Sequence, residues 1–230
     1  MQIIPFLQQQ KWLSRRNIVW LIKNGQIFLN NKKVESFKSE IKNWDILAFI
    51  NENWNKENIK ATEDCNKQKW KLIIFNKPKW YVVSKFDPHN STIYELLPDQ
   101  FKNWYYIGRL DKDSRGLVLL TDTPSLVHQF EHPKFEIQKE YLIQLSSPFK
   151  VEDKQKVKSW IFDEWERLKF LDIQPTKYSL TYKVVLNEWK KRHIRRVIKN
   201  LWYHLIDLQR IKEAQYTLPN DLPEGEWRFI

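Results

Sequence analysis

The densest group of chemically capable side chains lies in residues 108–122, with the sequence GRLDKDSRGLVLLTD, where a charged loop leads into an apolar strand. Such a loop can present the carboxylate of Asp111 at the edge of a sheet, beside cations. Composition alone favours a salt-bridged turn here. No glycine-rich phosphate loop, metal-ligand pattern or Ser/His/Asp arrangement in the sequence competes with this segment as a candidate site.

A second group is the basic run near the C-terminus. On a helix that begins at Lys191, spacing places four cations on one face and four apolar residues on another. The cations are Arg192, Arg195, Arg196 and Lys199, and the apolar residues are Ile194, Val197, Ile198 and Leu201. One face is expected to pack and the other to meet anions, although a basic stripe by itself is more often a solvated surface.

Metal chemistry is not expected. His128 and His132 have no carboxylate or cysteine ligands in a binding pattern beside them. The single cysteine, Cys65, permits neither an internal disulfide nor a cysteine-based metal cage.

Residues 1 to about 50 are predicted to form a small basic module. Ser14 can cap a helix that Gly25 ends, and Asn30-Asn31 fits the two-residue turn of a hairpin between 27–29 and 32–34. A last strand over 46–50 closes the module. The polar segment 51–69, NENWNKENIKATEDCNKQK, lacks an apolar period and is interpreted as a linker.

The remainder, residues 70–230, has strand-like runs at 71–75, 117–120, 141–145 and 178–186, and helix-like runs at 124–130, 151–160 and 191–201. Strands outnumber helices and do not alternate strictly with them. The sequence therefore predicts an α+β fold, with a small N-terminal domain over 1–60 and a second domain over 70–230 that has a mixed or largely antiparallel sheet.

Charge and length limit the class of protein. The 230 residues carry a net charge of +11, which is typical of a polyanion binder such as a nucleic-acid-binding protein. Because 42% of the residues are apolar, the chain can bury a sizeable core, which excludes disordered and low-complexity classes. No apolar run reaches the ~18 residues of a membrane span, so a soluble, cytoplasmic protein without a membrane partner is expected.

The motifs together resemble the bacterial ribosomal RNA pseudouridine synthases that carry an N-terminal S4 domain. Residues 108–122 are similar to the family pattern GRLD-x-x-[ST]-x-GL-x-LLT, and the first module, LSRRNIVWLIKNGQIFLNNKKV, is similar to an S4 domain. The segments 75–79, 139–142, 187–196 and 222–228 resemble the family's NKPKG, K-x-Y-L, EGRNRQIRR and LPPGEWR.

The resemblance implies that the protein isomerises a uridine of ribosomal RNA to pseudouridine without metal or organic cofactor, acting as a monomer on ribosomal RNA or a pre-ribosomal particle. It implies that Asp111 is the catalytic carboxylate, by C1′ addition or through a glycal, that Arg195 keeps it ionised, and that Tyr141 stacks near the base. Implied substrate-binding residues are Lys77, Arg109, Arg192, His193, Ile194 and Arg196. The implied RNA contacts of the S4-like module are Arg15, Arg16, Lys23, Lys32 and Lys33.

Two departures from the family matter. His193 stands where the family usually has Gln. Tryptophans fall at family glycine positions, in a chain with only 4 Gly but 12 Trp. These tryptophans are Trp12, Trp44, Trp80, Trp160, Trp165, Trp189 and Trp202, with Trp104 a weaker case and Trp227, at a family tryptophan, the control. We hypothesise that they are UGA codons that specify glycine. The alternative is a protein that uses its tryptophans to stack on bases or fill its core.

Two other functions remain open at this stage. A non-catalytic RNA-binding or ribosome-assembly protein would keep the fold but lack turnover, with His193 as the suspected cause. A general nucleic-acid chaperone would need the basic charge but not the GRLD loop.

Overall fold

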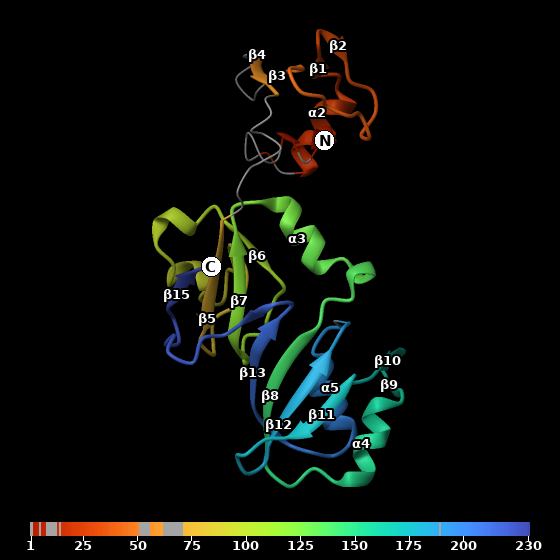
Figure 1. Cartoon of the computed structure of the whole chain (residues 1–230), viewed down its shortest axis with the longest axis vertical. Coiled ribbons are helices and arrows are strands. Elements are labelled where there is room, and N and C mark those ends of the chain that lie inside the picture. The colour runs from red at the N-terminus through yellow and green to blue at the C-terminus, as the bar shows by residue number, and fades with distance from the viewer. Residues whose placement is uncertain are drawn as a thin grey trace. The chain divides into compact units, whose positions relative to one another are not determined.

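The computed structural model of the chain describes residues 2–4, 6–7, 13, 15–50, 56–61, 71–188 and 190–230. The chain divides into a first unit, Met1–Trp70 with Thr123–Ser125, and a second unit, Lys71–Asp122 with Leu126–Ile230. Figure 1 shows the course of the chain through each unit. Among the described residues, no helix combines the length and the apolar character that crossing a bilayer requires.

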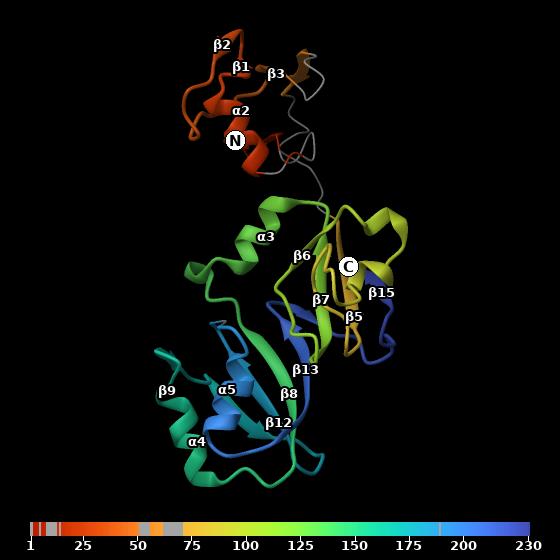
Figure 2. The same cartoon turned by 180° about the vertical axis from the view of Figure 1, so that it is seen from behind.

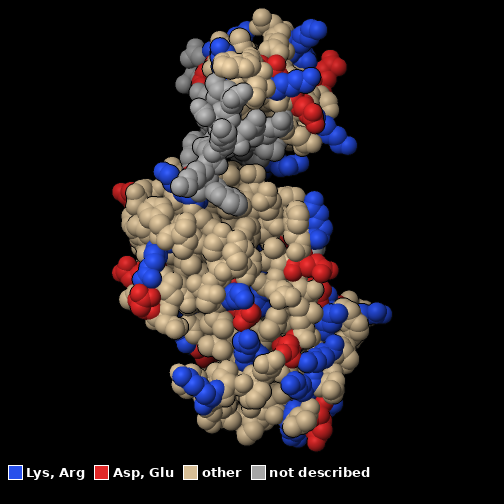
Figure 3. All heavy atoms as spheres, in the orientation of Figure 1, with Lys and Arg blue, Asp and Glu red and all other residues tan. Residues whose placement is uncertain are grey.

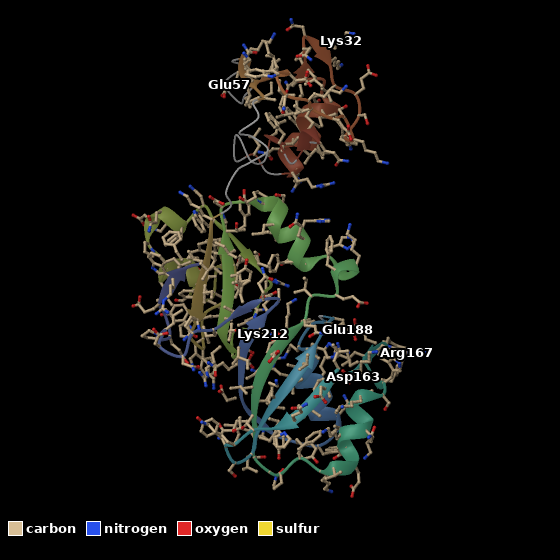
Figure 4. The ribbon with its side chains drawn as sticks, viewed as in Figure 1. Lys32, Glu57, Asp163, Arg167, Glu188 and Lys212 are labelled. Atoms are coloured by element: carbon tan, nitrogen blue, oxygen red, sulfur yellow. The ribbon has the colours of Figure 1, made fainter. Side chains whose placement is uncertain are left out.

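Among its described residues, the first unit contains the helix α2 and an antiparallel sheet with the order β2-β1-β3-β4. Its elements are α2 (Arg15–Lys23), β1 (Ile27–Leu29), β2 (Lys32–Lys33), β3 (Ile46–Ile50) and β4 (Lys56–Lys60). Lys32 and Glu57, labelled in Figure 4, belong to the two edge strands of this sheet. The buried face of α2, formed by Ile18, Leu21 and Ile22, packs into the core of the unit.

Local signals in the first unit are confirmed. Asn30 and Asn31 have φ angles of 48° and 64°, as a two-residue hairpin turn requires. Gly25 has a φ of 66° and its amide donates to the Ile22 carbonyl, which ends α2 as predicted. The predicted cap, Ser14, lies outside the described residues.

The linker prediction for residues 51–69 is wrong in part. Lys56–Lys60 is the edge strand β4, which pairs antiparallel with β3. Ile59 packs against the core of the unit and Ala61 is buried. The segment KENIK has one apolar residue, so its strand conformation depends on pairing with β3 and leaves no hydrophobic period in the sequence. Residues 51–55 and 62–69 lie outside the described residues.

The second unit is built on a mixed sheet with the order β11-β12-β8-β13-β7-β5-β15, to which β6 and β14 are added beside β7 and β13. Every pairing in it is antiparallel except that of β13 with β7. Its strands are β5 (Leu72–Lys77), β6 (Tyr105–Ile107), β7 (Arg115–Thr121), β8 (Lys139–Leu145), β11 (Asp172–Pro175), β12 (Thr181–Leu186), β13 (Leu205–Glu213), β14 (Tyr216–Thr217) and β15 (Trp227–Phe229).

The helices lie outside this sheet, together with a separate two-stranded hairpin. They are α3 (Pro124–Glu131), α4 (Val151–Lys158) and α5 (His193–Asn200), with 3-10 turns at Ile93–Glu95, Asp99–Phe101 and Pro133–Phe135, and the hairpin is β9 (Ile161–Asp163) with β10 (Glu166–Leu168). Figure 2 shows α5 and α4 on one face of the strands β8 and β12. The predicted α+β class with a mixed sheet is confirmed.

The apolar runs of β5 and β7 divide between two cores because successive side chains of a strand point to opposite faces. Ile73 and Val118 belong to the core that also contains Tyr141 and Ile194. Leu72 and Leu117 belong to a second core with residues of α3. These two central strands are therefore covered on both faces, which makes them a rigid support for the loop that joins β6 to β7.

Candidate active site

The loop that carries Asp111 joins β6 to β7 and starts at Gly108, which has a φ of 63°. It closes with a turn in which the Ser114 amide donates to the Asp111 carbonyl over 3.0 Å. At Gly116 a Cβ would lie 2.3 Å from the Arg210 carbonyl oxygen. Glycine is therefore required there for β7 to approach β13, and this approach fixes where the loop ends.

Lys77 of β5 holds the loop in place through hydrogen bonds from its side chain. Its side chain is fully buried, and its Nζ donates to the Ser114 carbonyl at 2.6 Å, the Pro78 carbonyl at 2.9 Å and the Lys112 carbonyl at 3.4 Å. Burial lowers the pKa of Lys77 to about 8, although Asp113 and Asp111 oppose this shift. Lys77 was expected to bind substrate, but its observed contacts are with the loop itself.

Asp111 is half-buried, with 24% of its side chain exposed. Burial raises the pKa of its carboxyl group above the ordinary value, and neighbouring Asp113 adds to the rise. The cations Arg192, Arg195 and Lys77 act in the opposite direction and favour the ionised form. The expectation that Arg195 keeps Asp111 ionised is therefore incomplete. Burial has the largest effect on the pKa of Asp111, and Arg192 opposes that effect more strongly than Arg195 does.

Arg195 lies on α5 and holds the loop at several points. Its guanidinium donates to the Asp113 carbonyl at 2.9 Å and to Ser114 Oγ at 3.0 Å, and it pairs with the Asp113 carboxylate at 3.1 Å. Its Nε lies 4.0 Å from Asp111 Oδ2. The closer partner of Arg195 is thus Asp113, a residue to which the sequence analysis gave no role.

Arg192 does not share a helical face with Arg195, contrary to prediction. It precedes α5 in the left-handed region, with a φ of 52°, and α5 begins at His193. This turn directs the Arg192 guanidinium to the Asp113 carboxylate, 3.2 Å away. Two arginines thus meet one carboxylate beside Asp111, and with 45% of its side chain exposed Arg192 can also reach solvent.

Tyr141 and Ile194 belong to the core of the second unit and are both almost fully buried. Burial raises the pKa of the Tyr141 phenol well above its usual range, while the neighbouring Arg210 guanidinium opposes the rise. The phenol is therefore protonated at neutral pH and can act as a hydrogen-bond donor. The negative charge of Asp111 also raises the pKa of Tyr141, but by less than burial and Glu213 do.

His193 and Arg196 have contacts elsewhere in the second unit. His193 is fully buried, and its Nε2 hydrogen-bonds with the Lys169 carbonyl at 3.1 Å. Burial lowers its pKa to about 4, so the ring is neutral at pH 7. Arg196 pairs with Asp163 and Glu166 of the β9–β10 hairpin, where Figure 4 labels Asp163. These contacts are structural, and RNA-binding roles for both residues stay predictions.

Arg109 is exposed and lines a cavity with Lys139 and Arg210. Sequence analysis did not single out Arg210 or Glu213, although both are fully buried on β13. The sequence carried no simple signal for this pair, because residues three positions apart point to opposite faces of a regular strand, and the register of β13 shifts between Arg210 and Lys212. A buried charge on a strand needs a partner, and here the two pair with each other at 3.3 Å.

The five cations predicted to bind RNA in the first unit are all exposed. They are Arg15, Arg16, Lys23, Lys32 and Lys33. Figure 3 shows lysine and arginine side chains, together with acidic ones, on the surface of each unit. Exposure leaves these groups able to contact phosphates, and their role stays a prediction.

Eight of the twelve tryptophans are among the described residues, and four of these have positive φ. Trp44, Trp80, Trp165 and Trp202 have φ angles of 71°, 74°, 65° and 63° and rings that are 63 to 96% exposed. A positive φ together with an exposed ring is what is expected where glycine is the residue that the backbone accommodates without strain. The Trp160 ring is half exposed, whereas Trp12 and Trp189 lie outside the described residues.

The control residue behaves differently. The ring of Trp227 packs edge-on against Phe101 at 4.5 Å, and its φ is not positive. Trp104, the weaker case, also has a buried ring that packs against Phe101 and lacks a positive φ. The structure therefore removes Trp104 from the group.

The arrangement as a whole can perform carboxylate chemistry. A half-buried carboxylate lies among cations and beside a protonated, buried phenol, so it can attack an electrophilic carbon or accept a proton. Within the described ranges, no group of three or more His, Cys, Asp or Glu residues is placed to hold a metal ion. The surrounding cations suit a substrate that carries phosphate groups.

A half-buried aspartate on a loop beside a mixed sheet is a candidate for carboxylate chemistry, and comparison with known proteins specifies the class of protein. The family model described as RNA pseudouridylate synthase matches residues 71–204, more than half of the chain. The chain belongs to the RNA pseudouridylate synthase family.

Relatives extend the match over the whole chain. A ribosomal large subunit pseudouridine synthase B from Buchnera aphidicola subsp. Baizongia pistaciae is 30% identical, with 98% of this chain and 92% of the relative covered. An uncharacterized RNA pseudouridine synthase from Aquifex aeolicus is 24% identical over 100% of this chain and 92% of its own length. A crystal structure of a pseudouridylate synthase matches the fold with a TM-score of 0.67 at 23% identity, covering 100% of this chain and 96% of that one.

Proposed function

We propose that the protein converts a specific uridine of ribosomal RNA to pseudouridine, with Asp111 as the catalytic carboxylate. The family match and the names of relatives that act on the large ribosomal subunit support this proposal. The observation that carries the assignment of Asp111 is its environment. It is the carboxylate that Arg192, Arg195 and Lys77 surround and that influences the buried Tyr141 phenol.

The reaction must break the N-glycosidic bond, rotate the uracil and rejoin it through C5. Asp111 must be ionised for either route, whether it adds to C1′ or removes a ribose proton. The three cations around it favour that form against the effect of burial. A uridine in folded RNA has to leave its stack to reach a half-buried carboxylate, so grips on the neighbouring phosphates are expected.

The first unit is proposed to be an S4-like RNA-binding domain. Its exposed cations on α2 and on the β1–β2 hairpin supply the charge that phosphate contacts need. Such contacts give affinity and orientation but carry no base identity. The choice of uridine then depends on RNA shape at the second unit.

We also propose that Trp44, Trp80, Trp165 and Trp202 are glycines in the cellular protein, encoded by UGA. A non-glycine residue in the left-handed region costs about 1–2 kcal/mol, and an exposed ring recovers none of this by burial. Sequencing tryptic peptides of the protein from its native cells distinguishes the two residues by mass. Tryptophan at all four positions contradicts the hypothesis.

The experiment that tests the function is mapping of pseudouridine in the ribosomal RNA of cells with and without the gene, followed by restoration with wild type or Asp111→Asn. The expected result is one or a few large-subunit sites that disappear with the gene and return with wild type only. A site restored by Asp111→Asn contradicts the role of Asp111. An unchanged map supports the alternative, a non-catalytic ribosome-assembly protein.

A further inference from the structure

A cavity of about 250 Å³ lies in the second unit, and no step of the proposed reaction uses it. It is lined by residues of the β6–β7 loop, the end of α3, β8 and β13, namely Gly108, Arg109, Glu131, Lys139 and Arg210. Four of these five residues are charged. Lys139 and Arg210 are buried, whereas Arg109 and Glu131 are exposed, so the cavity reaches the surface.

Charge is unbalanced behind this cavity. Lys139 and Arg210 are buried, with 9% and 0% of their surfaces exposed, and both pair with the same carboxylate, that of Glu213, which is also fully buried. The contacts are 3.4 Å from Lys139 Nζ and 3.3 Å from Arg210 Nη2. Two cations against one carboxylate leave a net charge of +1 in a region from which water is largely excluded.

The two remaining charged residues of the wall are both exposed and carry opposite charges. Glu131 is exposed, and its Oε1 accepts a hydrogen bond from the Gly108 amide at 3.0 Å. Arg109 is also exposed and carries the opposite charge. Glu131 acts electrostatically on Lys139 and balances the buried pair of cations together with Glu213, so the one excess positive charge of the whole group is that of the exposed Arg109. An anion that enters the cavity meets three cations and one carboxylate in its wall.

The cavity adjoins the candidate active site through two of its residues. Arg109 precedes Asp111 by two positions on the same loop. Arg210 donates to the Gly108 and Leu117 carbonyls, which frame this loop, and its guanidinium lies beside the Tyr141 phenol. An anion in the cavity would therefore be held next to the groups that face the target nucleotide.

We propose that this cavity binds a phosphate group of the RNA backbone close to the target uridine, with Arg109 at its entrance and Lys139 and Arg210 in its wall. The proposal rests on the proposed function, since RNA supplies the phosphate. A phosphate held there balances the net positive charge of the group and fixes the extruded nucleotide relative to Asp111. The binding is purely electrostatic and needs no change in covalent structure.

The first test measures RNA affinity against salt concentration for wild type, Lys139→Met and Arg109→Gln, with transcribed large-subunit ribosomal RNA as the probe. Loss of one phosphate contact lowers the slope of log K against log salt by about 0.7–0.9 and weakens binding roughly tenfold near 0.1 M salt. Lys139→Met leaves Arg210 paired with Glu213, so the fold is expected to persist. Arg109→Gln alters an exposed residue and is expected to fold, so its salt slope tests the proposal if Lys139→Met does not fold.

The matched control is Lys158→Met, which removes the same charge from an exposed lysine that is paired with Asp172 at 2.7 Å. Its salt slope is expected to equal that of wild type. The proposal is overturned if Lys158→Met loses as much slope as Lys139→Met. It is also overturned if the slope is unchanged both in folded Lys139→Met and in Arg109→Gln.

A second test identifies the phosphate. In short RNAs that contain the modified uridine, each phosphate near it is replaced in turn by an uncharged methylphosphonate. One replacement is expected to weaken binding by wild type about tenfold and binding by Lys139→Met much less. The proposal is overturned if, at every linkage, the loss caused by the methylphosphonate simply adds to the loss caused by Lys139→Met. Absence of pseudouridine in the RNA after treatment with wild type contradicts the proposed function instead, whatever the salt slopes are.

Discussion

The Asp111 loop and the basic surface of the first unit both depend on charge, but they use it in different ways. Around the loop, Lys77, Arg195 and Asp113 are buried or half-buried and each has defined partners within 2.6–3.1 Å. In the first unit, Lys32 and Lys33 are exposed on a two-residue strand. The loop therefore depends on one arrangement of its side chains, whereas RNA binding by the basic surface of the first unit depends only on the number of charges.

This difference predicts two kinds of mutational effect. Changes at the loop alter the position or the protonation of one carboxylate, so they act on turnover and depend strongly on each other. Changes at the basic surface each remove one screened contact, so they act on affinity, add up and fade at high salt.

The largest effect is expected for Asp111→Asn. The amide keeps the shape of the side chain but cannot add to carbon or accept a proton, so kcat falls on the order of ten-thousandfold or more. RNA affinity changes by about twofold at most. Single-turnover assays of tritium release or mass-spectrometric detection of pseudouridine measure the first quantity, and filter binding measures the second. Turnover retained in this variant removes Asp111 from the mechanism.

Lys77→Met is expected to reduce both stability and turnover. The loss leaves buried carbonyl groups of the loop without their donor, at about 1–3 kcal/mol each, and a shift of the loop by about 1 Å costs about a hundredfold in kcat. Neighbouring Lys79, whose Nζ pairs with Asp207 at 2.6 Å, is the matched control, and Lys79→Met is expected to lose less than about 1 kcal/mol. Urea unfolding and kcat measure the two effects. Equal losses in both variants contradict the anchoring role.

Arg195→Ala and Arg192→Ala separate positioning from charge. Both cations favour ionised Asp111 against a pKa that burial raises, so removing either moves the acidic limb of the pH–rate profile to higher pH. Because Arg195 also holds the Asp113 carbonyl and Ser114, its loss lowers the plateau above that limb by about tenfold to a hundredfold. Arg192→Ala is expected to keep most of the plateau. Identical profiles for the two variants refute this division of roles.

The sequence predicts well those features that depend on neighbours in the chain. The hairpin turn at Asn30-Asn31, the end of α2 at Gly25 and the apolar strands of the second unit follow from local backbone preference or from periodicity. The GRLD loop was recognisable because its residues are contiguous. The tryptophans at family glycine positions were recognisable from contiguous motifs in the same way, and four of them have a positive φ.

Features that depend on distant partners were missed or misplaced. The role of Lys77 comes from carbonyl groups 35 and 37 residues away along the chain, and that of Arg195 from groups more than 80 residues away. Arg192 was placed on a helical face because spacing cannot reveal a left-handed residue before a helix. β4 was interpreted as linker because its order comes from pairing with β3. Tertiary contacts decide each of these cases.

Combined substitution of Trp44, Trp80, Trp165 and Trp202 by glycine is expected to stabilise the protein. Relief of a positive φ raises the free energy of unfolding by about 1–2 kcal/mol per site. The greater freedom of glycine in the unfolded chain cancels about half of this gain. Trp227→Gly is the control and is expected to lose on the order of 3 kcal/mol, since its ring packs against Phe101 and Phe229. Urea unfolding gives both values, and a fourfold variant less stable than the parent protein refutes the hypothesis.

The smallest effect is expected at the basic surface of the first unit, in the double variant Lys32→Gln/Lys33→Gln. Both side chains are exposed on β2, so their loss leaves the fold intact and removes at most two phosphate contacts. The salt slope of RNA binding then falls by at most roughly 1.4 to 1.8, and affinity near 0.1 M salt falls by at most about 25- to 60-fold. Turnover at saturating RNA is unchanged because no contact of Asp111 is touched. The double variant Lys38→Gln/Lys42→Gln removes the same charge from exposed lysines outside the predicted set and keeps the slope of wild type. A lower kcat in Lys32→Gln/Lys33→Gln at saturating RNA would mean that the first unit takes part in the chemistry, and the contrast between the two regions would then fail.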